Sequence, residues 1–265
     1  MSYHDVLIWM YKRYMSPDSY YSHGFIIPLV SGFLIWQKRK ELKEEETGFS
    51  RSGLFLIISA VLIHVVGTII YVFSLSGFSV FLLIMGISLF LLGKNITRII
   101  WFPLVFTIFM FPLPEAFISV LSFPMKLLVA EIGVRIIDLM GIPIYREGFN
   151  ITIQAGSLLV GNPCSGLRSL ISFLALGAVF AYMSNTSTSM KWLLFFVTIP
   201  IALLSNMIRV PILILISHFW GLSEAAPDSF WHDASGVFVF VLGLFLLFCT
   251  GRILQCKSCE TDICC

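Results

Sequence analysis

Long apolar runs recur along most of this chain. Many are about 17–25 residues long, which is the length that a helix needs to cross a lipid bilayer. The composition agrees, since 58% of the 265 residues are hydrophobic and 12% are charged. Soluble domains carry roughly 25% charged residues, and the mean hydropathy of this chain is +0.93. The sequence therefore predicts a multi-pass helical membrane protein and excludes a large water-soluble domain.

Polar residues between the apolar runs divide the chain into candidate spans. These lie near residues 24–37, 53–73, 77–93, 98–114, 164–184, 191–212 and 233–250. A break near Pro211 would add an eighth span and would place His232 on the inner side. The predicted fold class is thus an all-α polytopic membrane protein with about seven, or alternatively eight, transmembrane helices.

Basic residues orient the spans, because cytoplasmic loops carry an excess of Lys and Arg. The loop 37–51 contains three lysines and two arginines, and Lys94, Lys191 and Arg252 mark later inner ends. The C-terminus is then cytoplasmic. We predict one membrane-embedded domain over residues 1–250, followed by a cysteine-rich cytoplasmic tail at 251–265. The expected location is the cell (inner) membrane, with the lipid bilayer as a partner.

The outer side collects the long connection 115–163. Its first part is apolar but contains Pro124, so we expect a break there and helices that lie in the membrane interface. A helix packed on the bundle is the alternative. In the second part, Asn150 and Thr152 alternate with Ile151 and Ile153, which is the periodicity of a strand. We predict a short extracytoplasmic β-hairpin that leads directly to Cys164.

Cys164 stands at the start of the candidate span 164–184. Asn162 is a good helix N-cap and Pro163 suits the first helical position, which places Cys164 in the first turn. The helix dipole there favours a thiolate, and Arg168 one turn later adds positive charge. Cys164 is therefore a candidate nucleophile. A buried structural cysteine is the alternative interpretation.

Arg209 lies within the candidate span 191–212, and Asn206 shares its helix face. An arginine at the centre of a span costs about 2.5–3.5 kcal/mol on insertion scales, so it usually has a function or a partner. Arg209 is suited to hold an anionic group, such as the oxyanion of acyl transfer. The alternative is an arginine whose charge reaches the outer interface.

His232 is predicted at the outer end of the last span. Asp228 lies one helical turn before it and Asp233 follows it, so either carboxylate is a candidate to orient the imidazole. Cys164, Arg209 and His232 then share one membrane face. These residue types fit the nucleophile, oxyanion stabiliser and base of a thiol acyltransferase.

No cofactor is expected at this site. The histidines lack the spacing of metal ligands, so we predict no metal ion. The formal net charge of +2 is small and predicts no nucleic-acid partner.

Four sequence blocks resemble the exosortase/archaeosortase family of multi-pass cysteine transpeptidases. They are "DSYYSHGFIIPLVSGFLI", "REGFNITIQAGSLLVGNPCSGLRSL", "SNMIRVPILILI" and "WHDASGVFVF", in the family's order over residues 18–250. The resemblance implies a catalytic trio of Cys164, Arg209 and His232 at the outer face of the membrane. Arg168 and Asn206 lie in the same blocks and are candidate supporting residues.

The resemblance also implies a substrate class. Family members process secreted proteins with a C-terminal sorting signal, which is a short motif such as Pro-Glu-Pro, a transmembrane helix and a basic cluster. The cleaved chain would form a thioester with Cys164 and pass to an acceptor, often alongside exopolysaccharide production. Two alternatives remain open from the sequence: a multi-pass transporter, and a non-catalytic assembly protein for envelope polysaccharide.

Overall fold

The computed structural model describes residues 2–16, 19–154, 156–161, 165–227 and 229–261. The chain is mostly helical and forms two compact units, Met1–Ile118 and Ser119–Cys265. Helix α7 (Glu115–Leu139) begins in the first unit and ends in the second. The first unit also contains α1 (Tyr3–Met15), η1 (Ser22–Phe25), α2 (Ile26–Gln37), α3 (Arg39–Glu44), α4 (Arg51–Ile69), α5 (Phe73–Ile99), α6 (Trp101–Phe106) and η2 (Thr107–Met110). The second contains β1 (Ile144–Glu147), β2 (Asn150–Ile153), β3 (Gly156–Leu159), α8 (Leu167–Met183), α9 (Thr188–Trp220), η4 (Leu222–Ala225) and α10 (Phe230–Thr261).

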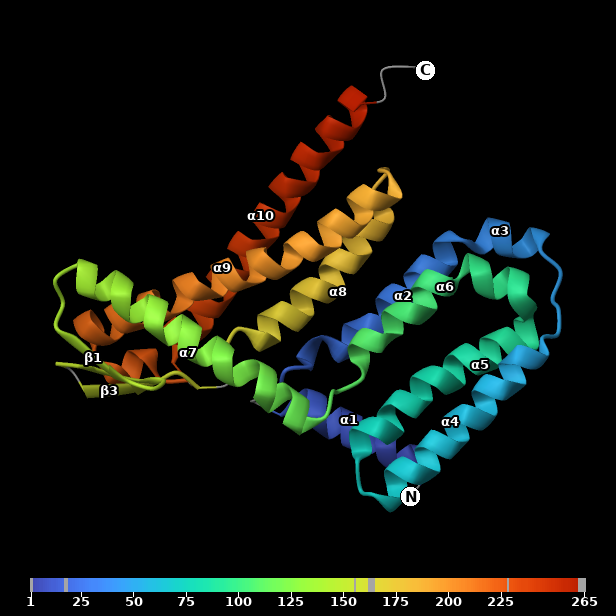
Figure 1. Ribbon diagram of the computed structural model, residues 1–265, viewed down its shortest axis with the longest axis horizontal. Coiled ribbons are helices and arrows are strands. Elements are labelled where there is room, and N and C mark those ends of the chain that lie inside the picture. The colour runs from blue at the N-terminus through green and yellow to red at the C-terminus, as the bar shows by residue number, and fades with distance from the viewer. Residues whose placement is uncertain (1, 17–18, 155, 162–164, 228, 262–265) are drawn as a thin grey trace. The chain divides into compact units, whose positions relative to one another are not determined.

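Helices α4 and α5 form a closely packed antiparallel pair in the first unit (Figure 1). Glycines allow this approach. A Cβ atom on Gly53 would lie 2.3 Å from the backbone nitrogen of Phe90, and one on Gly86 would lie 3.0 Å from that of Ile57. Small residues at helix contacts are a common means of association in membranes, where there is little hydrophobic force between helices.

Five of the described helices are long and apolar enough to cross a membrane: α4, α5, α7, α9 and α10. The predicted spans 53–73, 77–93, 191–212 and 233–250 fall on four of them. The other three predicted spans correspond to shorter apolar helices at Ser22–Gln37, Trp101–Met110 and Leu167–Met183. A polytopic helical architecture is therefore confirmed, whereas the count of seven or eight spans is not.

The prolines within the long helices do not break them. We expected a break at Pro124, and this was wrong, because α7 continues through it over 25 residues. A proline removes one backbone hydrogen bond, and neighbouring turns of an apolar helix can absorb that loss. Helix α9 likewise continues through Pro211 as one helix of 33 residues, which agrees with a single long helix and not with the break that would add a span.

The predicted hairpin is present as β2 and β3, and a third strand extends it. The sheet is antiparallel in the order β1-β2-β3, with Ile151 opposite Leu158 and Arg146 opposite Ile151. A two-residue turn joins β1 to β2, and Gly148 begins it with a positive φ of 63°. Such turns require a left-handed backbone that glycine adopts without strain.

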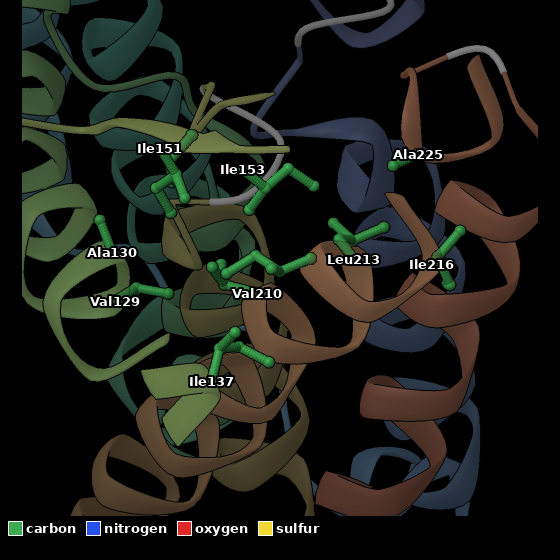
Figure 2. Packing of buried hydrophobic residues seen from close by; sticks show 11 residues of the cluster. Val129, Ala130, Ile137, Ile151, Ile153, Val210, Leu213, Ile216 and Ala225 are labelled. Carbon is green, nitrogen blue, oxygen red and sulfur yellow. The ribbon is translucent and has the colours of Figure 1, made fainter. Parts of the chain in front are cut away.

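The sheet is anchored on an apolar cluster in the second unit. Figure 2 shows Ile151 and Ile153 directed toward Val210 and Leu213 of α9. Side chains of α7 complete the cluster, and Ile137 among them is fully buried. The second half of α9 therefore packs against the sheet, and η4 follows it in the chain.

We predict that Gly53→Ala destabilises the α4–α5 pair. The added methyl group would meet backbone atoms of α5, which cannot rotate away, and overpacking of this kind costs about 1–3 kcal/mol. Thermal unfolding in detergent should show a lower midpoint. Gly32→Ala in α2 is the matched control, since nothing lies within 4 Å of its Cβ position. Equal midpoints for the two variants would contradict the close contact.

Candidate functional site

Three helices of the second unit carry the described candidate residues, Arg168, Asn206, Arg209 and His232. Gly177 of α8 lies against Thr198 of α9, whereas Gly166 just before α8 lies against Asn206, so the two helices run in opposite directions. Phe173 of α8 lies against Gly243 of α10, and the rings of Phe173 and Phe240 are 5.0 Å apart. The starts of α8 and α10 lie near one another along α9, because Gly166 contacts Asn206 and Gly236 of α10 contacts Arg209.

Asn206 packs on the segment that leads into α8. Its side chain is 2% exposed, and a Cβ atom on Gly166 would lie 2.5 Å from its Nδ2 atom. Gly166 also has a φ of 80°, a conformation that side chains other than glycine rarely adopt. Helix α9 therefore contacts the chain two residues after Cys164.

The start of α8 differs from the prediction. The helix begins at Leu167, and Gly166 is its N-cap in a left-handed conformation. The hydroxyl of Ser165 accepts a hydrogen bond from the backbone N–H of Leu167 at 3.3 Å. The expected start of the helix before residue 165 was therefore wrong, and Arg168 is the second residue of α8, because the left-handed Gly166 ends the helix on this side. Residues 162–164, with Cys164, lie outside the described part of the chain.

Arg209 joins α9 to α10. Its Nη2 atom donates to the backbone carbonyl oxygen of His232 at 3.2 Å, and its Nε atom donates to the Ser235 hydroxyl at 3.4 Å. The Ser235 hydroxyl in turn donates to the same carbonyl at 2.7 Å. Gly236 leaves room for the guanidinium, because a Cβ atom there would lie 3.2 Å from Nη2.

His232 is buried in the first turn of α10, with 4% of its surface exposed. Its backbone N–H donates to the Ser229 hydroxyl at 3.1 Å, which is the usual N-cap hydrogen bond. Its ring Nδ1 lies 3.3 Å from the carbonyl oxygen of Ala225. A carbonyl can only accept, so this hydrogen bond requires the proton on Nδ1 and leaves Nε2 as the basic nitrogen of the neutral ring.

From the sequence, a carboxylate of Asp228 or Asp233 is expected to orient the His232 imidazole. Asp228 lies outside the described residues, and Asp233 is exposed, with its charge acting on the ring from a distance. The Ala225 carbonyl was missed because a backbone group has no signature in the sequence. The sequence does carry a signal for Ser229, because serine is a preferred N-cap residue and Ser229 immediately precedes α10. The only sequence signal for Ser235 is its position three residues after His232, on the same face of the helix.

Two positively charged side chains act on the His232 imidazole, which is the candidate base. Arg209 and Arg168 both interact electrostatically with the His232 imidazole, so guanidinium groups from α8 and α9 act on one ring from α10. Such a group of side chains can stabilise an anion and can exchange a proton with it. Within the described residues, no three His, Cys, Asp or Glu side chains lie close enough together to hold a metal ion.

Comparison with known families identifies the chain. The family model of transmembrane exosortases matches residues 12–249, a range that includes Arg168, Asn206, Arg209 and His232. No curated protein and no solved structure matches the chain. The family implies a multi-pass membrane protein with transpeptidase chemistry, in agreement with the five long apolar helices. The match covers most of the 265 residues, and the chain therefore belongs to the transmembrane exosortase family.

Proposed function

We propose that this protein is a membrane cysteine transpeptidase that cleaves the C-terminal sorting signal of secreted proteins. The observation that supports this most directly is the hydrogen bonding of Arg209 to the turn that carries His232. It joins an anion-binding group to a base, and Asn206, one turn before Arg209, packs on the chain next to Cys164. Family membership supports the same chemistry.

In the first step, Nε2 of His232 accepts the proton of the Cys164 thiol. The thiolate attacks the carbonyl carbon of the scissile peptide, and a C–S bond forms as the carbonyl oxygen becomes an oxyanion. Arg209 stabilises this charge. Its guanidinium is already held by α10 before substrate arrives, so little reorganisation is needed when the charge develops.

In the second step, the C–N bond breaks and the oxyanion returns to a carbonyl. The protonated His232 gives its proton to the leaving amine, which departs with the signal helix. The secreted protein remains as a thioester on Cys164. An acceptor hydroxyl, amine or water then attacks this thioester and regenerates the thiol, with His232 again acting as the base.

The proposed substrate matches the orientation of the enzyme. Its signal helix would lie in the bilayer, with the scissile peptide at the outer face and the basic cluster inside. The basic loop 37–51 supports this placement through the same positive-inside rule.

Replacement of the nucleophile tests the proposal directly. We expect Cys164→Ala to abolish conversion of a co-expressed, tagged protein that carries a C-terminal motif, helix and basic cluster. Cys249→Ala, in the middle of α10, should convert substrate as the wild type does, since Cys249 belongs to no part of the site. The readout is the ratio of cleaved to intact substrate on a gel. Unchanged cleavage by Cys164→Ala would contradict the mechanism and favour a transporter or an assembly protein.

Arg209→Lys tests the role of the guanidinium. A lysine keeps the charge but cannot donate from Nε and Nη2 to the two groups of α10, so its charge would not be fixed in position. The rate of cleavage should fall by about 10²–10³-fold, as it does when one oxyanion donor is removed. Arg135→Lys is the control, because Arg135 is exposed and pairs with Glu131 on the same helix. A full rate with Arg209→Lys would refute the assignment.

Gly166→Ala tests the contact between α9 and the segment beside Cys164. The added methyl group would collide with Asn206 and strain a left-handed residue, so we expect reduced cleavage at a normal level of protein. Gly221→Ala carries the same kind of strain, with a φ of 97°, but meets nothing within 4 Å. If both variants cleave substrate equally well, the Asn206 contact does not position the site.

A further inference from the structure

A polar pocket of about 410 Å³ lies within the first unit, between the start of α4 and the bend in α5. Its volume is in the range of ligand pockets, which is about 300–1,000 Å³. The candidate transpeptidase residues belong to the second unit, and none of them lines the pocket. Polar and charged side chains line it, among them Arg51, Lys94, Asn95 and Glu46.

Two glycines shape the pocket. Helix α5 bends at Gly93, where φ is 80° and ψ is 179°. The backbone N–H of Gly48 donates to the carbonyl oxygen of Leu92 at 3.2 Å, and a Cβ atom on Gly93 would lie 2.9 Å from the Cα atom of Gly48. Figure 1 shows the link from α3 to α4 running beside this end of α5. Close contact between the backbones at Gly48 and Gly93 therefore forms one wall of the pocket. The rings of Phe49 and Phe90 also pack together, with their centroids 4.7 Å apart.

The lining has an excess of positive charge. Arg51 and Lys94 form no ion pair within the described part of the chain, and Glu46 is the acidic residue of the lining. The adjacent Glu45 accepts a hydrogen bond from Asn95 at 3.2 Å. Arg51 is also the first residue of α4, where the helix dipole adds partial positive charge. Glu45 lies outside the lining, and the charged side chains that line the pocket leave one net positive charge, which suits the single negative charge of a phosphodiester.

The surroundings of the pocket suit a lipid. Arg51 begins a helix that is long and apolar enough to span the bilayer, so the pocket lies at the end of a candidate span, at the level of the headgroups. Large apolar side chains next to it are exposed, Phe49 to 66%, Phe55 to 72% and Leu91 to 61%. The sequence places this loop on the cytoplasmic side, where basic pockets between helices bind lipid headgroups.

We propose that this pocket binds the phosphate of a membrane phospholipid headgroup. Arg51 and Lys94 hold the phosphate oxygens, and the acyl chains lie against the exposed apolar side chains of α4 and α5. The proposal does not depend on the transpeptidase activity, since it is tested by lipid retention and not by cleavage.

The test compares two double variants of the full-length protein purified in detergent. Arg51→Gln with Lys94→Gln removes both pocket charges. Lys40→Gln with Lys43→Gln removes two charges from the same loop outside the pocket lining. Native mass spectrometry measures bound phospholipid during a titration. Loss of charge-assisted hydrogen bonds should weaken binding at least about tenfold in the first variant and leave the second near wild type. Equal binding by both would overturn the proposal.

Two further arms identify the ligand and exclude misfolding. Titration of the delipidated protein with inorganic phosphate should give much weaker binding than phospholipid, and equal binding would overturn the assignment to lipid. Arg51→Lys with Lys94→Arg keeps both charges and should retain phospholipid. If this variant loses lipid as the glutamine variant does, while both melt at the wild-type temperature, the charges are not the reason for binding.

Discussion

The hydrogen bonds from Arg209 to α10 are the interaction on which the candidate site depends. An arginine within an apolar bundle is costly unless its donors are satisfied. Here the His232 carbonyl and the Ser235 hydroxyl accept from it, and both belong to the first turns of α10. The same contacts that stabilise the charge therefore fix the position of the helix that carries the base. A guanidinium whose donors must be satisfied within the bundle thus also positions the first turns of α10.

Helix α9 is the common support for the rest of the second unit. Along its length it meets α8 at Thr198, the start of α8 at Asn206, α10 at Arg209 and the sheet at Val210 and Leu213. Figure 2 shows how its last turns carry the apolar face of the sheet. Because one continuous helix makes these contacts, its register sets the relative positions of Gly166, Arg209 and His232. A break at Pro211 would have separated Val210 from Leu213, which together contact the sheet.

Close contacts at glycines recur in both units. Gly53 and Gly86 bring α4 against α5, Gly93 lets the loop from α3 close on α5, and Gly166 accepts the side chain of Asn206. In a bilayer the apolar surfaces of helices gain little by leaving lipid, so packing and hydrogen bonds must supply the association. The glycines provide that packing, and at two of these positions the positive φ also ends or bends a helix.

The sequence by itself determined the features that rest on local chemistry. Hydropathy located α4, α5, α9 and α10, strand periodicity located β2 and β3, and an arginine inside a span indicated a charged group with a partner, which the structure shows on α10. Strand β1 was missed because two of its four residues are charged, which hides the alternation of a strand. Only the tertiary structure decided where α8 begins, that α7 continues through Pro124, and which group orients His232. These depend on contacts between distant segments: Asn206 packs on Gly166 from another helix, and Ala225 acts through its backbone carbonyl. Such contacts have no local pattern, because the partners are set by how the helices pack and not by the residues beside them.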